Sequence, residues 1–387
     1  MNGRAALIVT HGVPAFDRDG AGWLSMIAIR ALLEDGWAVT VVSEDLHPED
    51  AGRVRVLEQL GAEVYAGPQS VGARESYLAP RDVGTLLEGS GFALVVIQFW
   101  GLAEHWIPPL RRLLPQARVI IDSVDVHLLR VIRGRMMGLD GSAQPVLDAE
   151  LWHAVFGELN VYASADAVFA VSRREADLLG TLLGRERFAF HVPLGSDPPL
   201  LDPPPAAGRN GLLYVGGFTH LPNPQAVAVL LDQIVPLLTP ELREQHPVRI
   251  VGAGITPELA EEWTEHDHVI PVGWAPTLGP EFAQARAFVA PLPNGAGVKT
   301  KILLALSAGL PVITNRFGIE GMGVEPGEHV LLAETPQEFA AAIAQVAADD
   351  ALWTRLSRAG RAWALSESGP GPASAAFRAA VGTVMAR

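Results

Sequence analysis

The sequence predicts an α/β protein with two Rossmann-like parallel-sheet domains in tandem, and three observations support this fold class. Apolar, β-branched segments of strand length recur along the chain, helical segments lie between most of them, and one proline-rich segment interrupts the series. Continuous apolarity indicates strands that are buried on both faces of a sheet. The alternation of such strands with helices is typical of parallel α/β domains.

The first series contains an amphipathic helix at 23–36, after the first strand. Its predicted strands are 5–10, 38–44, 93–99, 118–123, 167–172 and 188–192. The segment 195–211 then breaks the pattern with five prolines and three glycines. Because it shows no periodicity, we interpret it as the linker between the two domains.

The second series follows this linker. Its predicted strands are 212–217, 248–254, 268–274, 287–292, 310–315 and 329–333, with a helix at 222–238 after the first of them. Three further helices are predicted at 336–348, 350–365 and about 372–386. The run 366–372 is the predicted crossover into the last helix, because it contains two glycines and two prolines.

Composition excludes several classes of protein. The 387 residues carry a net charge of −14, which repels nucleic-acid phosphates and makes nucleic acid an unfavourable partner. The chain has no cysteine, so disulfides, thiolate catalysis and cysteine-ligated metals are excluded. No apolar stretch approaches the ~18 residues of a spanning helix, and residues 1–10 lack the features of a signal peptide. We therefore expect a cytoplasmic protein.

A glycine-rich turn precedes a predicted helix at the end of a strand. Gly295 and Gly297 lack a Cβ atom, so their backbone can approach a ligand closely. The backbone N–H groups near Gly297, Val298 and Lys299 can point at an anion, and Lys299 or Lys301 adds positive charge. A diphosphate fits this arrangement; an ordinary strand–turn–helix with solvated lysines fits it equally well.

The loop after the first strand has a similar arrangement. Gly20 and Gly22 precede the amphipathic helix, so two glycine-rich helix starts are expected to face each other across a cleft. Asp17 and Asp19 have the Asp-x-Asp spacing of a divalent-metal site. Their place before a glycine turn favours capping or contact with an acceptor instead, and we expect no metal.

Polar residues also follow the strand at 118–123. Asp125 and His127 come just past the strand end, where a residue of a cleft belongs, and an aspartate can fix the tautomer of a nearby histidine. A histidine packed on a turn is the alternative. Arg130 and the two arginines after it could bind an anion or form a solvated face. "VGAG" at 251–254 begins a dinucleotide fingerprint without its third glycine.

Taken together, these segments resemble the GT-B fold glycosyltransferases, in particular bacterial enzymes of family 4 (glycosyl transferases group 1). The resemblance covers nearly the whole chain. The segments that carry it are "FDRDGAG" (16–22), "DSVDVHLLR" (122–130), "ADAVFAVSRREADLL" (165–179), "YVGGFTHLPNPQAVAVLL" (214–231) and "GAGVKTKILLALSAGLPVITNRFGIEGM" (295–322). The last of these is the most specific.

The resemblance implies two Rossmann-like domains that face each other across a cleft. Residues 1–196 would form the acceptor-binding domain, with a helix of about 371–387 packed back on it, and residues 208–368 would bind the nucleotide-sugar. The implied reaction transfers a sugar from a nucleoside-diphosphate sugar, with retention of anomeric configuration and without a metal or other cofactor. The acceptor stays open among small molecules, polysaccharides, lipid-linked glycans and proteins. A homo-oligomer and a peripheral place at the inner face of a membrane are compatible with this reading.

The resemblance also implies roles for individual residues. His127 would position the transferred sugar, and Lys301 would stabilise the leaving phosphates. The expected donor-binding residues are Gly20, Gly22, Gly217, Gly252, Trp274, Gly295, Ala296, Gly297, Val298, Lys299 and Glu320. The expected acceptor-binding residues are Asp17, Asp19, Asp125 and Arg130. For Trp274, contact with the nucleobase and a place in the core are both open.

The sequence departs from the family pattern at two glutamates. Ala296 and Leu304 stand where the family carries them, and Glu320 cannot simply take either role. This departure motivates a second hypothesis, in which the chain is a non-catalytic binding or scaffold subunit that works with an active transferase. A sugar-nucleotide epimerase or a phosphorylase on the same fold is a third hypothesis.

Overall fold

The computed structural model describes residues 4–66, 86–137, 148–295 and 297–387. The chain divides into two compact units. Unit 1 comprises Met1–Gly195 and Pro370–Arg387, and unit 2 comprises Ser196–Gly369. In the described ranges, no helix combines the length and apolarity needed to cross a bilayer.

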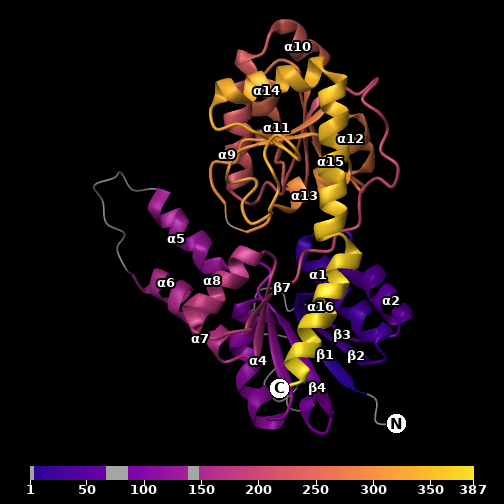
Figure 1. Cartoon of the computed structure of the whole chain (residues 1–387), viewed down its shortest axis with the longest axis vertical. Coiled ribbons are helices and arrows are strands. Elements are labelled where there is room, and N and C mark those ends of the chain that lie inside the picture. The colour runs from indigo at the N-terminus through magenta and orange to yellow at the C-terminus, as the bar shows by residue number, and fades with distance from the viewer. Residues whose placement is uncertain (1–3, 67–85, 138–147, 296) are drawn as a thin grey trace. The chain divides into compact units, whose positions relative to one another are not determined.

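Unit 1, which contains the labelled strands β1 to β4 and β7 of Figure 1, is built on a parallel sheet. The strand order is β3-β2-β1-β4-β5-β6-β7. Its strands are β1 (Ala5–Gly12), β2 (Ala38–Asp45), β3 (Glu63–Ala66), β4 (Phe92–Gln98), β5 (Arg118–Asp122), β6 (Ala167–Ala170) and β7 (Ala189–His191). The order reverses direction between β1 and β4, so the carboxyl ends of these two strands form a topological switch point. The continuous burial of β1, β4 and β5 confirms strands covered on both faces.

Helices surround this sheet. They are α1 (Gly20–Glu34), α2 (Ala51–Leu60), α4 (Trp100–Leu113), α5 (His127–Met137), α6 (Ala149–Trp152), a π-helix (His153–Gly157), α7 (Glu158–Ala163), α8 (Arg173–Leu183) and α16 (Pro370–Met385), with a short 3₁₀ turn at Pro48–Asp50. The C-terminal helix α16 packs along α1, where Arg378 forms ion pairs with Glu34 at 2.6 Å and Asp35 at 2.9 Å. Residues 370–387 are thereby part of unit 1.

Unit 2 has a parallel sheet in the order β10-β9-β8-β11-β12-β13, with its switch point between β8 and β11. Its strands are β8 (Leu212–Val215), β9 (Val248–Val251), β10 (Val269–Gly273), β11 (Ala287–Ala290), β12 (Val312–Thr314) and β13 (Leu331–Leu332). Its helices are α9 (Pro222–Ala228), α10 (Pro240–Gln245), α11 (Pro257–Thr264), α12 (Gly279–Gln284), α13 (Thr300–Ser307), α14 (Pro336–Ala348) and α15 (Asp350–Ser368).

Two details differ from the sequence-based prediction. The edge strand β3 was not predicted, because "EVYA" is short and alternates between half-buried and exposed residues. The helix predicted at 222–238 is α9 followed by a π-helix (Val229–Ile234) and a 3₁₀ turn (Val235–Leu237). Pro236 explains the end of this run, because proline cannot donate the hydrogen bond that continues a helix.

The proline-rich segment 196–211 belongs to unit 2 and is held on its surface by two arginines. Arg209 is buried and donates to the backbone oxygens of Pro204 at 2.7 Å and Phe282 at 2.8 Å. Arg361 on α15 donates to the oxygens of Leu200 at 2.9 Å and Leu201 at 2.8 Å. The carbonyls of Pro204, Leu200 and Leu201 lie in a segment without strand partners, and that of Phe282 lies near the end of α12, so the guanidinium groups satisfy them.

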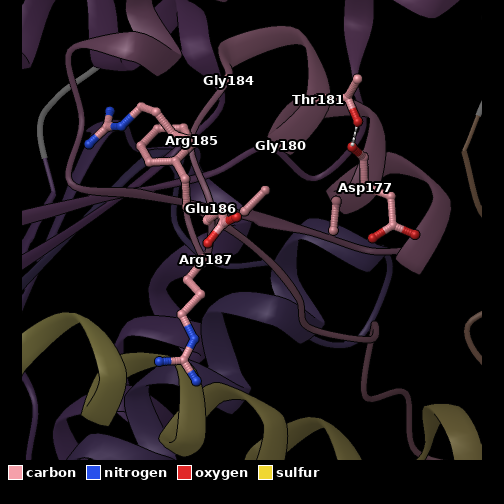
Figure 2. Close-up of a pocket in the computed structure, with 10 residues that line it drawn as sticks. Asp177, Gly180, Thr181, Gly184, Arg185, Glu186 and Arg187 are labelled. Atoms are coloured by element: carbon pink, nitrogen blue, oxygen red, sulfur yellow. Dashed lines mark hydrogen bonds between the residues drawn. The ribbon is translucent and has the colours of Figure 1, made fainter.

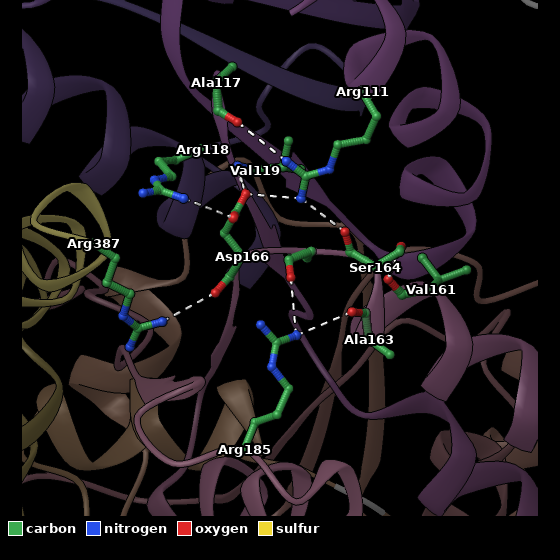
Figure 3. Close-up of polar contacts among 11 residues, drawn as sticks. Arg111, Ala117, Arg118, Val119, Val161, Ala163, Ser164, Asp166, Arg185 and Arg387 are labelled. Atoms are coloured by element: carbon green, nitrogen blue, oxygen red, sulfur yellow. Dashed lines mark hydrogen bonds and ion pairs between the residues drawn. The ribbon is translucent and has the colours of Figure 1, made fainter. Parts of the chain in front are cut away.

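A second arginine cluster holds the amino-terminal edge of the unit 1 sheet (Figure 3). Asp166, just before β6, pairs with Arg111 at 2.9 Å and Arg118 at 3.4 Å, and its backbone oxygen accepts from Arg387. Arg111 and Arg185 also donate to the carbonyls that end α7. Positive charge at a helix C-terminus is favourable, so the cluster stabilises this edge of the sheet.

Candidate active site

The candidate site residues lie at the two switch points, one in each unit. In an open parallel sheet, ligands bind at the carboxyl ends of the strands next to such a point. In unit 1 these ends are followed by Phe99 and by the turn that leads to His127. In unit 2 they are followed by the glycines 216–217 and by the turn that leads to Lys301.

The imidazole of His127 is held from both of its nitrogens. The indole N–H of Trp100 donates to Nδ1 at 3.2 Å, so Nδ1 is an acceptor and the ring proton lies on Nε2. Nε2 in turn lies 2.8 Å from the carboxylate of Asp125, which also pairs with Arg130 at 2.8 Å. The structure therefore pairs Asp125 with His127, as the sequence predicted, adds Arg130 to the pair, and fixes one tautomer of the histidine.

The backbone around this histidine is strained at two strand ends. Phe99 follows β4 with φ 64°, and Val124 follows β5 with φ 60°. A positive φ is rare for a residue with a Cβ atom and rarer still for a β-branched one. The Phe99 ring lies 6.0 Å from that of His127 and 5.7 Å from that of His11. Such strain collects at functional sites, where the surrounding structure imposes it.

A buried carboxyl group supports the same turn. Asp122, the last residue of β5, accepts the N–H of Val124 at 3.1 Å and is buried, which raises its pKa to about 7. The side chain of Gln98 also hydrogen-bonds Asp122, which favours the charged form, and donates to the oxygen of Ala21 at 2.7 Å. Gln98 thus connects the Asp122 turn to the glycine-rich start of α1.

The geometry of the α1 start does not support the donor role expected there. The carboxylate of Asp19 accepts the N–H of Gly22 at 2.7 Å, so that N–H is already used. A Cβ atom on Gly22 would lie 2.3 Å from the carbonyl carbon of Ala15, so Gly22 is needed for contact with the preceding loop. Gly20 is buried as the first residue of α1. At this helix start, the missing Cβ atom of Gly22 makes room for the backbone of the preceding loop and not for a ligand.

The two aspartates of this loop have structural partners. Asp19 is the N-cap of α1, as the capping alternative predicted. Asp17 forms two hydrogen bonds with Arg53, at 2.7 and 3.1 Å. Burial opposes ionisation of Asp17, but the bonds and charge of Arg53 outweigh it and lower its pKa. An acceptor would have to compete with these partners.

In unit 2, Lys301 is turned toward strand β8. Its ammonium group donates to the hydroxyl of Tyr214 at 2.9 Å and contacts the side-chain oxygen of Asn223. It also lies 4.6 Å from the centroid of the Tyr214 ring. Burial, with the nearby charge of Lys299, lowers the pKa of Lys301 to about 7. A nearby anion would favour the charged form of this lysine.

The start of α13 differs from the starts of α1 and α5 in its N-cap. Its N-cap residue is Lys299, whose side chain bends back to donate to the oxygen of Gly297 at 2.6 Å. Among the described residues, no N-cap side chain accepts from its first N–H groups. In α1 and α5, by contrast, the carboxylates of Asp19 and Glu158 accept those groups. An anion fits best at α13.

The other predicted donor-binding residues lie around this turn and along the neighbouring strand ends. Gly217 follows β8, and a Cβ atom there would meet nothing within 4 Å. Gly252 instead serves the fold, because its Cβ would lie 1.7 Å from the oxygen of Gly216. Trp274 is 58% exposed and is not part of the core.

Three further predicted residues lie on the turns of this edge. Gly295 and the half-buried Val298 belong to the turn before α13, and Glu320 lies half-buried in the turn after β12. Ala296 lies outside the described residues.

Three residues of these sites were not predicted as such from the sequence. Glu158 is 31 residues from His127 and accepts its backbone N–H at 2.9 Å. Tyr214 and Asn223, which hold Lys301, lie in the quoted segment 214–231, but their side chains looked like ordinary strand and helix residues. Their role is visible only in the structure, where both side chains contact Lys301.

A separate cavity of about 540 Å³ lies between the end of α8 and the start of β7. Figure 2 shows that the charged groups of Asp177, Arg185 and Arg187 point in different directions. The Arg185 guanidinium covers the Phe188 ring at 3.9 Å. Because its polar groups do not converge and it adjoins the amino-terminal edge of the sheet, this cavity is not part of the candidate site.

Comparisons with known proteins bear on the family and the fold of the chain. Residues 209–349 match the family model described as "Glycosyl transferases group 1". No curated protein sequence matches the chain.

Solved structures match the fold over nearly the whole chain. Sucrose-phosphate synthase from Thermosynechococcus elongatus has a TM-score of 0.72 at 18% identity, with 100% of both chains covered. Anabaena Alr3699/HepE, in complex with UDP and glucose, has a TM-score of 0.70 at 15% identity, covering 98% of this chain and 100% of that one. WaaG, a glycosyltransferase involved in lipopolysaccharide biosynthesis, has a TM-score of 0.68 at 14% identity, covering 97% and 98%.

The chain is therefore similar to the group 1 glycosyl transferases over residues 209–349 and has the GT-B fold of glycosyltransferases over nearly its whole length.

Proposed function

We propose that the chain transfers a glycosyl group from a nucleoside-diphosphate sugar to an acceptor. The observation that carries this proposal is the start of α13. It lies at the β8/β11 switch point, follows a glycine-rich turn, has no capping side chain among the described residues and lies beside Lys301. Backbone N–H groups, the helix dipole and a lysine together form a favourable environment for a diphosphate.

The leaving nucleoside diphosphate gains negative charge as its bond to the sugar breaks. The N–H groups of Gly297, Val298 and Lys299 would stabilise that charge, because their positions are set by the turn before the reaction begins. Lys301 would contribute as a cation once the phosphates replace part of its lost hydration. Gly217 leaves room for the donor beside the turn, and Trp274 offers an exposed ring for the nucleobase.

In unit 1, His127 would position the transferred sugar. Trp100 and Asp125 hold both ring nitrogens and so fix the ring, and a sugar oxygen would accept Nε2–H in competition with the carboxylate of Asp125. Asp125 and Arg130 would contact the acceptor. We propose retention of the anomeric configuration and no metal requirement, as in the family that the sequence resembles.

The structural neighbours support a nucleotide-sugar donor. The solved structures of Anabaena HepE hold UDP, UDP with glucose, and UDP-glucose. A TarM structure from S. aureus holds UDP together with α-GlcNAc-glycerol. A nucleoside diphosphate such as UDP is the kind of anion that we propose for the start of α13.

One feature favours a second function. Leu304 on α13 is half-buried and offers no carboxylate to ribose hydroxyls. A chain that lacks this contact would serve as a non-catalytic partner of an active transferase.

Thermal unfolding with UDP, GDP, ADP and TDP, each at about 1 mM, tests the binding step, because a ligand that binds only the folded state raises Tm. We expect at least one nucleotide to raise Tm, and Lys299→Ala combined with Lys301→Ala to abolish the shift. Mass spectrometry with a panel of nucleotide-sugars then tests turnover. Binding without turnover would favour the scaffold function, and no shift with any nucleotide would contradict the proposal.

A further inference from the structure

The carboxylate of Glu158 caps the helix that carries His127. Glu158 is the first residue of α7, and its exposed fraction is 0%. Oε1 accepts the N–H of His127 at 2.9 Å and the hydroxyl of Tyr162 at 2.7 Å. Oε2 accepts the N–H of Leu128 at 2.6 Å. A carboxylate at this place satisfies two N–H groups that α5 cannot bond internally and complements the helix dipole.

This cap comes from a distant part of the chain, although a local one would be simpler. Helices are usually capped by a serine, threonine or aspartate that directly precedes them. Burying a carboxylate on another helix costs free energy, which its bonds to the two N–H groups and to Tyr162 offset. A cap built from another helix ties the position of α5, and with it His127, to α7.

The segment before Glu158 also helps to hold the ring of His127, through Trp100. The π-helix directly before α7 contains His153, whose ring packs 5.4 Å from that of Trp100. Trp100 is the residue that donates to Nδ1 of His127. The backbone and the ring of His127 are thus both held through residues 153–158, and π-helical turns occur frequently at functional sites.

We propose that Glu158 is a positioning residue that fixes His127 for glycosyl transfer. This inference rests on the proposed function. Glu158 does not touch the substrates; it determines where His127 begins α5 and so how the imidazole meets Trp100 and Asp125. Loss of the cap would let the first turn of α5 fray and would misplace the ring.

The pH dependence of this arrangement follows from the groups around Glu158. Tyr162 on α7 and His127 on α5 face it directly, and Asp125 and Glu175 lie near Tyr162. Burial raises the pKa of Glu158 to about 7, against the effect of the Tyr162 hydrogen bond and the His127 charge. Below this pH the protonated group loses acceptor capacity, so turnover should fall on the acid side.

The test compares Glu158→Gln and Tyr162→Phe with a matched pair in the same unit. Tyr65 donates to Glu63 at 2.6 Å on the exposed edge strand β3, so Glu63→Gln and Tyr65→Phe make the same two substitutions in a tyrosine–glutamate pair away from the site. For Glu158→Gln we expect kcat to fall about ten- to hundredfold, with the KM for the donor within about twofold of wild type. The control pair should leave kcat unchanged.

The pH profile separates positioning from a structural role. The acid limb of kcat should disappear in Glu158→Gln and move to higher pH in Tyr162→Phe, which removes a bond that favours the carboxylate. Asp122→Asn should keep the limb, which excludes Asp122 as its source. A folded Glu158→Gln variant with wild-type kcat and an unchanged acid limb would overturn the proposal.

A second readout does not depend on turnover. ¹⁵N NMR of the imidazole, assigned with His127→Gln, should show the Nε2–H tautomer in the wild type and mixed tautomers in Glu158→Gln. If the His127 signals are the same in both, Glu158 does not position the ring, whether or not the wild type turns over any donor. If they differ but no donor is consumed, the positioning stands and the proposed function fails.

Discussion

The ammonium group of Lys301 lies 2.9 Å from the hydroxyl of Tyr214, across the switch point between β8 and β11. These residues are 87 positions apart in the sequence. The contact ties the first turn of α13 to the first strand of unit 2. It places a buried amine directly beside the proposed diphosphate site.

Replacement of Lys301 by methionine should change how stability depends on pH. Burial lowers the pKa of Lys301 from its ordinary value of 10.5 to about 7. Between these two pH values the unfolded chain binds more protons than the folded one, so the free energy of unfolding should rise as pH rises. Urea denaturation between pH 7 and 10 should show this rise in the wild type and a flatter curve in Lys301→Met. If stability depends on pH equally in both proteins, the pKa of Lys301 is not lowered, which would mean that water reaches its ammonium group.

His127→Gln should reduce turnover by about a hundredfold or more, because the amide cannot reproduce the contacts of the ring with Trp100 and Asp125. Nucleotide affinity, measured by calorimetry, should stay within about twofold of wild type, since the proposed anion site is in unit 2. His105→Gln, an exposed histidine on α4, is the control. Equal turnover in the two variants would remove His127 from the mechanism.

Gly252→Ala should destabilise the protein strongly, whereas Gly217→Ala should not. The added methyl group of Gly252→Ala would lie 1.7 Å from the oxygen of Gly216, and φ is 147° there, while the methyl group of Gly217→Ala would meet nothing within 4 Å. Overpacking of this kind costs about 1–3 kcal/mol or more. Chemical denaturation of both variants measures the difference. Similar unfolding free energies would mean that the β8 and β9 ends separate easily.

Asp122→Asn should remove a pH dependence of the opposite sign. Burial raises the pKa of Asp122 from 3.8 to about 7, so the folded chain binds more protons than the unfolded one between these values. Wild-type stability should therefore decrease as pH rises through this window. The asparagine variant, which keeps an acceptor for the N–H of Val124, should equal or exceed the wild type in stability at pH 8. Glu158, whose pKa is also raised to about 7, should keep part of this pH dependence in both proteins. A variant that loses as much stability between pH 5 and pH 8 as the wild type does would contradict this assignment.

The sequence determined the elements that depend on local pattern. Continuous apolar segments predicted the strands of both sheets except β3, and glycine-rich turns at strand ends pointed to the helix starts of α1 and α13. The Asp-x-His spacing at 125–127 indicated the paired side chains that the structure shows at 2.8 Å. Such signals are readable because they arise from neighbours within one turn or one strand.

Tertiary structure alone decided which helix starts were already occupied. Asp19 uses the N–H of Gly22, and Glu158 reaches α5 from another helix, whereas the start of α13 has no such side chain among the described residues. It also decided that Lys301 is turned toward Tyr214 and Asn223. A glycine before a helix looks the same in sequence whether it admits a ligand or the protein's own backbone, because the difference lies in groups brought there by the fold.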